Sequence, residues 1–160
     1  MNDDLAAMAR SIIDANVYVT LATASQDGTP WANPVFFAHD GYRDFYWVSS
    51  PETVHSRNLA VRPRLSMVVF DSQVTPGSGQ AVYMSATARQ VTDLEPALAI
   101  YPGDPSRGGR PMTADYLSAP NPYRLYVASA DDHHVLCPRE TGVPCSPHGL
   151  SYDHRIAVTP

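Results

Sequence analysis

The sequence contains no lysine: all 11 of its basic residues are arginines. Without lysine the chain cannot form a lysine Schiff base, so pyridoxal-phosphate enzymes of the ordinary kind are excluded. A P-loop lysine and a lysine nucleophile are excluded for the same reason. Any bound anion must therefore be held by arginine, histidine, hydroxyl groups or backbone N–H groups.

Cysteines and long apolar runs are also scarce. Two cysteines do not suggest a disulfide scaffold, and a reducing cytoplasm is the expected compartment. No segment approaches the roughly 18 consecutive apolar residues that span a bilayer, and the N-terminus does not resemble a signal peptide. The net charge of −5 disfavours non-specific nucleic-acid binding. We therefore expect neither a membrane nor a nucleic acid as partner.

What is present is a β-rich pattern in 160 residues, the size of one domain. Hairpin turns and alternating apolar residues predict a mainly β protein with short helices, in an antiparallel barrel. Residues 131–160 are expected to form an irregular C-terminal tail of that single domain, 1–160. The predicted helices cover 3–14, 52–60, 92–100 and 113–117, and the predicted strands cover 17–25, 31–38, 44–48, 64–71, 81–91 and 123–129.

Residues 47–59 carry the strongest local signal for a binding site. A strand leads into a hydroxyl-rich helix start, and a histidine and an arginine follow within two turns. Hydroxyls, a guanidinium and the free N–H groups of a helix N-terminus are the groups that hold a dianionic phosphate. The alternative is an ordinary capped surface helix. The candidate residues are Ser49, Ser50, His55, Ser56 and Arg57.

Several segments carry a family resemblance through their order and spacing. They are Val19–Thr23, Asp27–Pro30, Asn33–Phe37, Phe45–Ser50, His55–Leu59, Arg62–Phe70 and Gln80–Ala88. Together they resemble the pyridoxamine 5′-phosphate oxidase-like, FMN-binding split barrels over about residues 5–130. The resemblance implies a homodimeric antiparallel split β-barrel with FMN at the subunit interface.

The resemblance also implies positions for the cofactor. The flavin ring would lie against the strand that contains Asn33, Pro34, Val35 and Phe36, and Gln80 would face the flavin. The phosphate would be held by the five residues of the helix start, with His55 at a position where the family often carries Lys or Arg. The region after Tyr123 differs from the Arg-rich substrate-binding tail of the true oxidases, so vitamin B6 oxidase activity is not carried over.

The function predicted from this resemblance is an FMN-dependent oxidoreductase that acts on a small organic molecule in the dimer-interface cleft. Three alternatives stay open. They are an F420-dependent reductase, for which basic residues are few, a haem-binding or haem-degrading split barrel with His133 or His134 as ligand, and a non-enzymatic flavin-binding module. No residue is a convincing general acid or base; His133, His134 and Tyr83 are the least implausible.

Two further segments have competing interpretations. The loop Tyr101–Pro111 is either a disordered connection or a lid whose Arg107 and Arg110 meet an anionic ligand. In the tail, the spacing Cys-x7-Cys-x2-His-x5-His is not a standard zinc spacing, so no metal site is predicted and a packed polar tail is favoured. Metal or haem ligation is the alternative for that segment, whose candidate ligands are Cys137, Cys145, His148 and His154.

Overall fold

The computed structural model describes residues 2–139 and 142–160. Among the described residues, its strands follow one another in groups, and short helices separate these groups. In chain order they are α1 (Asn2–Ala15), β1 (Tyr18–Ala24), β2 (Pro30–Phe36), β3 (Ala38–Asp40), β4 (Asp44–Ser49), α2 (Val54–Val61), β5 (Arg64–Phe70), β6 (Ala81–Gln90), α3 (Leu94–Leu98), η1 (Pro105–Arg107), β7 (Arg124–Leu136) and β8 (Arg155–Val158).

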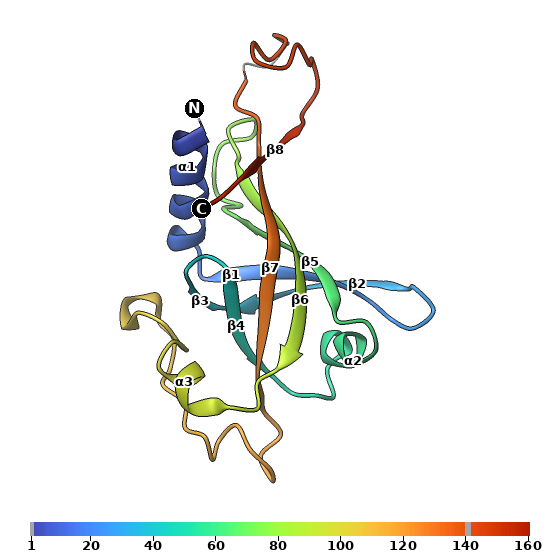
Figure 1. The fold of residues 1–160 in the computed structure, drawn as a ribbon, viewed down its shortest axis with the longest axis vertical. Coiled ribbons are helices and arrows are strands. Elements are labelled where there is room, and N and C mark those ends of the chain that lie inside the picture. The colour runs from blue at the N-terminus through green and yellow to red at the C-terminus, as the bar shows by residue number, and fades with distance from the viewer. Residues whose placement is uncertain (1, 140–141) are drawn as a thin grey trace.

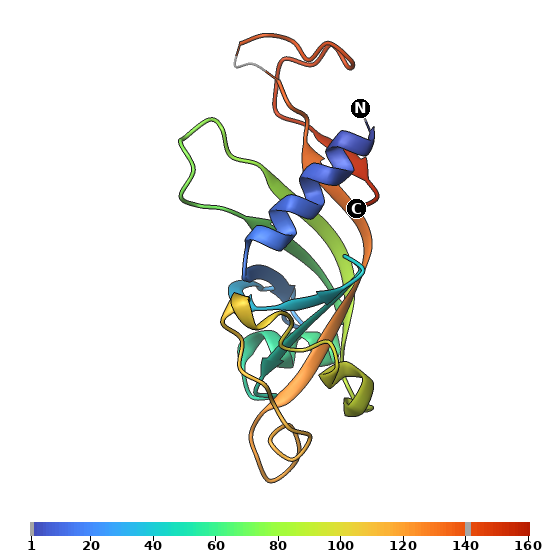
Figure 2. The ribbon, with the colours of Figure 1, turned by 90° about the vertical axis from the view of Figure 1, so that its left-hand side faces the viewer.

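The strands form one antiparallel sheet that curls into a half-barrel (Figures 1 and 2). Its order is β2-β1-β5-β6-β7-β4-β3, and β8 pairs with β7 beyond that path. This confirms the predicted mainly β, antiparallel architecture. Within the described residues, no helix has both the length and the hydropathy needed to cross a membrane.

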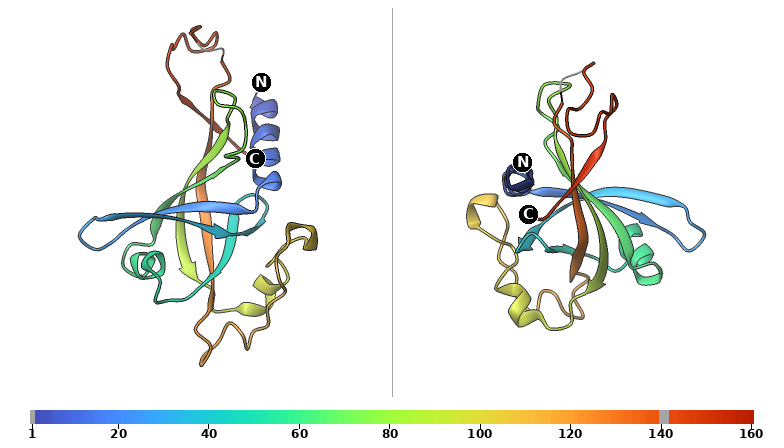
Figure 3. Two further views of the ribbon diagram at one scale, coloured as in Figure 1. Left: turned by 180° about the vertical axis from the view of Figure 1, so that it is seen from behind. Right: turned by 45° about the horizontal axis from the view of Figure 1, so that its top comes forward.

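The main core lies inside the curl of the sheet. Apolar residues alternate on β1 and β5, so Val19, Leu21, Met67 and Val69 point inward while their neighbours face outward. The helix α1 covers one end of this core with a face that includes Ile13, and it contacts β5, β6 and β8 (Figure 3). The helix predicted over 3–14 and the strands predicted over 17–25 and 64–71 are therefore confirmed.

Strand β7 is buried on both faces over its first half. Tyr126 and Ala128 contribute to the main core, whereas Leu125 and Val127 pack in a second cluster with residues of the α3 region. The second cluster exists because the segment 94–117 folds back over the outer side of β7. Burial on both faces explains why apolar residues follow one another without alternation in the first half of β7.

A β-bulge interrupts the pairing of β6 with β7 between Ser85 and Ala86. The Asp132 carboxylate accepts a hydrogen bond of 2.9 Å from the Ser85 backbone N–H, so this donor has a partner despite the register shift. That backbone hydrogen bond lowers the pKa of Asp132.

The prediction of an irregular tail over residues 131–160 is wrong in two places. Strand β7 continues to Leu136, and β8 forms a further strand at its edge; residues 140–141 of that tail lie outside the described residues. The second half of β7 could not be recognised in the sequence. Its residues Asp131–His134 are all polar, so the alternation of apolar residues that indicates a strand is absent. The predicted helix at 113–117 is also wrong, since this segment forms turns.

The two predicted helix starts shift by one or two residues. Helix α2 begins at Val54 rather than residue 52, because Thr53 is the N-cap. Helix α3 has Asp93 rather than Thr92 at the N-cap, and Asp93 makes no side-chain capping hydrogen bond. The helix start predicted at residue 92 therefore lies two residues too early.

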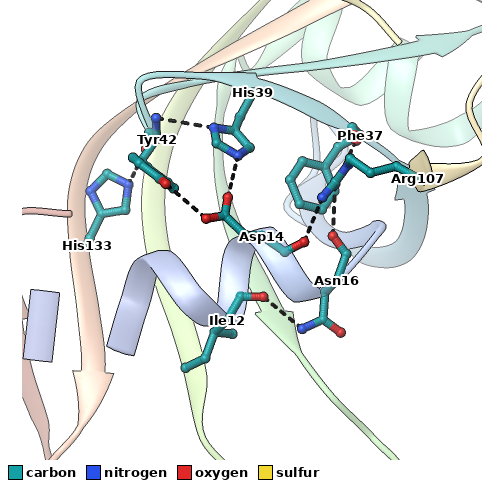
Figure 4. A network of polar contacts seen from close by, with 8 residues as sticks. All are labelled: Ile12, Asp14, Asn16, Phe37, His39, Tyr42, Arg107 and His133. Atoms are coloured by element: carbon teal, nitrogen blue, oxygen red, sulfur yellow. Dashed lines mark hydrogen bonds and ion pairs between the residues drawn. The ribbon is translucent and has the colours of Figure 1, made fainter. Parts of the chain in front are cut away.

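The loop Tyr101–Pro111 is attached to the body of the molecule by Arg107 (Figure 4). Its guanidinium donates hydrogen bonds to the backbone carbonyls of Asp14 (3.0 Å), Asn16 (2.8 Å) and Phe37 (3.2 Å). A Cβ at Gly109 would lie 2.8 Å from the Phe36 ring, so this part of the loop also packs closely. Arg107 thus has a structural role, which neither of the two interpretations, a disordered connection or a lid, included.

The Arg107 contacts lead to a stability prediction. Arg107→Ala should lower the free energy of unfolding by at least about 2 kcal/mol, because it removes three hydrogen bonds from a charged donor and each such bond contributes about 1.5–3 kcal/mol. Arg110→Ala, in the same loop but exposed, should change it by less than about 0.5 kcal/mol. Urea unfolding of both variants measures the difference, and equal stabilities would contradict the structural role of Arg107.

Candidate functional site

A cluster of hydroxyls surrounds the start of α2, directly after the end of β4. Thr53 has extended backbone geometry and accepts a hydrogen bond of 3.4 Å from the Ser56 N–H, as an N-cap does. The His55 Nε2 atom lies 2.9 Å from Ser49 Oγ and 3.2 Å from Thr53 Oγ1. The structure therefore brings Ser49, His55 and Ser56 together as predicted, and adds Thr53, which sequence reasoning did not single out.

The cluster holds a neutral imidazole. Ser49, His55 and Ser56 are buried, and burial lowers the pKa of His55, because removal from water disfavours the charged ring. His55 therefore supplies no positive charge near neutral pH; it orients the two hydroxyls beside it.

The positive charge at this site comes from arginine at its exposed edge. A hollow of about 310 Å³ beside the helix is lined by Ser56, Arg57, Arg89 and Tyr126, among others. The Arg57 guanidinium lies 3.8 Å from the Glu52 carboxylate, and both side chains are largely exposed. Such an exposed pair is weak, so Arg57 is available to an anion. Arg89 at the end of β6 was missed, since nothing in its local sequence links it to α2.

Strand β2, the predicted flavin-ring strand, is an edge strand that contacts both α2 and β4. Its side chains are exposed or half-buried throughout, and Pro34 is tolerated because an edge strand leaves one side unpaired. The Asn33 Oδ1 atom is buried and has no hydrogen-bond partner among the described residues. A buried acceptor of this kind is costly unless a ligand or a partner satisfies it.

Gln80 lies apart from this group within one chain. It precedes β6 and lines a separate hollow with Phe70 and Tyr83, and its Oε1 atom is also buried without a partner among the described residues. The structure therefore does not bring Gln80 to the α2 cluster of the same chain.

The outer face of the sheet forms a groove of about 630 Å³. Tyr83 and His134 lie in register across β6 and β7, and the Arg155 guanidinium stacks 3.8 Å from the centre of the Tyr83 ring. Other residues that line this groove include Thr20, Ser66, Ser85 and Asp132.

The two histidines proposed as haem ligands have different surroundings. His133 Nε2 lies 2.7 Å from the Tyr42 backbone carbonyl (Figure 4), and burial lowers the pKa of His133. This hydrogen bond occupies the Nε2 atom of His133. His134 lines the groove, with Nδ1 at 3.6 Å from the Asp132 carboxylate. His134 is therefore the more suitable of the two to meet a ligand.

A family model described as pyridoxamine 5′-phosphate oxidase matches residues 5–132. The chain belongs to the pyridoxamine 5′-phosphate oxidase family. The curled antiparallel sheet agrees with the split-barrel fold of this family. No curated protein sequence matches the chain.

Solved structures of this fold carry different names. A haem binding protein from Mycobacterium smegmatis has a TM-score of 0.65 at 20% identity, and the match covers 93% of this chain and 56% of that protein. The haem storage protein HutZ from Vibrio cholerae has a TM-score of 0.63 at 19% identity, covering 78% and 89%. An F420 reductase has a TM-score of 0.57 at 23% identity, covering 78% and 94%. At these identities the likeness shows the fold alone.

The neutral, buried His55 leads to a pH prediction. A histidine with a lowered pKa in the folded state destabilises the protein as the pH falls below the ordinary value of about 6.5, because the unfolded state then binds more protons. His55→Gln should therefore show a smaller loss of unfolding free energy between about pH 7.5 and pH 5 than the natural chain. Urea unfolding at both pH values measures this. An identical pH dependence in the two proteins would contradict a buried neutral His55.

Proposed function

We propose that the chain binds FMN as a homodimer and acts as a flavin-dependent oxidoreductase on a small organic molecule. The observation that carries this proposal is the α2 cluster, where hydroxyls, the helix N-terminus and the Arg57 guanidinium meet at the edge of a hollow. This combination suits a phosphate monoester, because it offers several N–H and O–H donors together with a positive charge.

The residues on β2 fit the ring system of the same cofactor. The pyrimidine part of a flavin carries an N–H donor, and the buried Asn33 Oδ1 lacks one. Because β2 contacts α2 and β4, a single ligand can reach both Asn33 and the hydroxyl cluster. When bound, FMN would supply the redox chemistry, while Asn33, Val35 and Phe36 would orient the ring and Ser50, Ser56 and Arg57 would hold the phosphate.

A second protomer accounts for two other features. Tyr18, Trp31 and Phe70 are exposed aromatic residues at 59%, 46% and 46%, and β2 is unpaired on one side. Exposed aromatic residues beside an open edge mark an interaction surface. In a dimer, Gln80 of one chain could serve the site of the other, which would explain its separation from α2 in a single chain.

Haem is the second candidate, and His134 is the observation that favours it. Its ring lines the outer groove of about 630 Å³, and a carboxylate beside Nδ1 is an arrangement that favours coordination through Nε2. F420 fits less well, because its anionic tail needs more positive charge than Arg57 and Arg89 supply beside α2.

Arg57→Ala should weaken FMN binding about 10- to 150-fold, the effect of losing about 1.5–3 kcal/mol of a charge-assisted hydrogen bond. The matched control is Arg64→Ala, an equally exposed arginine on β5 that pairs with Asp131; it should bind FMN as the natural chain does. Flavin fluorescence titration measures all three proteins. Riboflavin should also bind the natural chain more weakly than FMN, because it lacks the phosphate.

Equal affinities for FMN and riboflavin would contradict the phosphate site. Failure to bind either flavin, together with a Soret band that His134→Ala removes, would replace the proposal with haem binding. Light scattering in the same samples tests the homodimer. For the activity itself, anaerobic bleaching of bound FMN by NADH or NADPH is expected, and a flavin that no donor reduces would indicate a non-enzymatic flavin-binding module.

A further inference from the structure

Four potential metal ligands converge in the segment after β7. Cys137 directly follows β7, and His154 directly precedes β8. The antiparallel register pairs Leu136 with Arg155 and continues by one position, because the Cys137 N–H donates to the His154 carbonyl at 2.9 Å. The strand pairing therefore sets Cys137 and His154 opposite each other at the end of the ladder.

The loop between these residues returns the other two side chains to the same point. The Cys145 N–H donates to the Leu150 carbonyl at 2.8 Å, and the N–H groups of His148 and Gly149 donate to the Cys145 carbonyl at 3.2 and 2.6 Å. This tight turn, in which Gly149 has φ of +66°, directs Cys145 and His148 toward each other. Cys137 and Cys145 are both buried.

The ligand atoms lie within a few tenths of an ångström to about 0.8 Å of the separations of a small tetrahedral site, three of the four distances being shorter. Cys137 Sγ lies 3.0 Å from Cys145 Sγ and 3.7 Å from His148 Nδ1, and Cys145 Sγ lies 3.2 Å from that same nitrogen. His154 Nε2 lies 3.1 Å from His148 Nδ1, and all four atoms lie within 4.8 Å of one another. Zinc–sulfur bonds of about 2.3 Å and zinc–nitrogen bonds of about 2.0–2.1 Å require ligand separations of about 3.3–3.8 Å.

Hydrogen bonding among these four groups does not explain their arrangement. His154 Nδ1 lies 3.0 Å from the Tyr152 carbonyl, so it carries the proton, and Nε2 is left with a lone pair. The Nδ1 atom of His148 faces three atoms at once: the Nε2 atom of His154 and the sulfur atoms of Cys137 and Cys145. A single N–H group can donate a hydrogen bond to only one of these three atoms. One cation at the centre would satisfy all four atoms.

We propose that Cys137, Cys145, His148 and His154 bind one zinc ion. On binding, two thiols release their protons to solvent and form two zinc–sulfur bonds, and no oxidation or reduction takes place. Two thiolates balance the charge of Zn²⁺, and two neutral imidazoles complete the tetrahedron. Sulfur and imidazole ligands favour zinc over calcium or magnesium. Because the protein fills all four positions, the site is structural rather than catalytic.

The zinc ion would take the place of a hydrophobic core in this part of the chain. Between β7 and β8 the described residues form turns and irregular structure, and an ion pair of 2.8 Å joins Arg139 to Asp153 near the base of the loop. Such a segment buries little apolar surface, so a metal is a common source of its stability. The metal would also hold β8 against β7, where Val158 is buried in the main core.

The test measures metal in the full-length chain, purified without a histidine tag and dialysed after exposure to zinc. Mass spectrometry of the metal content should find about one zinc per chain. Cys145→Ser and His148→Ala should each lower it at least about tenfold. His134→Ala is the matched control, since His134 lies on β7 outside the cluster, and it should retain zinc. Circular dichroism should show that each variant keeps its sheet.

Cobalt gives a second measurement that needs no variant. Co²⁺ added to the zinc-free chain should produce the intense visible bands of tetrahedral cobalt and a near-ultraviolet thiolate-to-cobalt band, and zinc should abolish both. The weak bands of octahedral cobalt would overturn the proposal. So would a Cys137–Cys145 disulfide in the freshly purified, unreduced protein, or a natural chain that binds no zinc. These readouts do not involve flavin, so they stand apart from the proposed function.

Discussion

The antiparallel pairing of β7 joins the two parts of the sheet, because β7 lies between β6 and β4. This strand pairs with β4, β6 and β8 in turn, and the Asp132 carboxylate preserves hydrogen bonding at its bulge. Tyr126 near its start lines the hollow beside α2, His134 lines the outer groove, and Cys137 after its end joins the Cys/His cluster. One strand thus positions residues in three different candidate sites.

The α2 cluster shows why a helix cap and an anion site are hard to distinguish. Thr53 satisfies the Ser56 N–H internally, and His55 is neutral because it is buried. These contacts already stabilise the helix start, so they do not by themselves require a ligand. A ligand is indicated instead by groups that the fold leaves unsatisfied or exposed, namely the buried oxygen of Asn33 and the guanidinium of Arg57.

Much of the barrel could be predicted from the sequence, because β1, β5 and β6 alternate and α1 is amphipathic. The end of β7 could not, because polar residues fill its half-open face and its pairing with β8 joins residues about 20 positions apart. The Cys/His cluster could not be predicted either, because it depends on the same long-range pairing. Its spacing matches no zinc pattern, and only the register of two strands places Cys137 opposite His154. The role of Arg107 could not be predicted for the same reason. Its acceptors include the carbonyls of Asp14 on α1 and of Phe37 after β2, which are far from Arg107 in the sequence.

A crystal structure of the chain grown with FMN would locate the phosphate, the ring and the partner protomer together. We expect the phosphate within hydrogen-bond distance of the α2 N-terminus and of Arg57, and a flavin N–H that donates to Asn33 Oδ1. A flavin bound in the outer groove beside Tyr83 and His134, with no ligand at α2, would contradict this expectation.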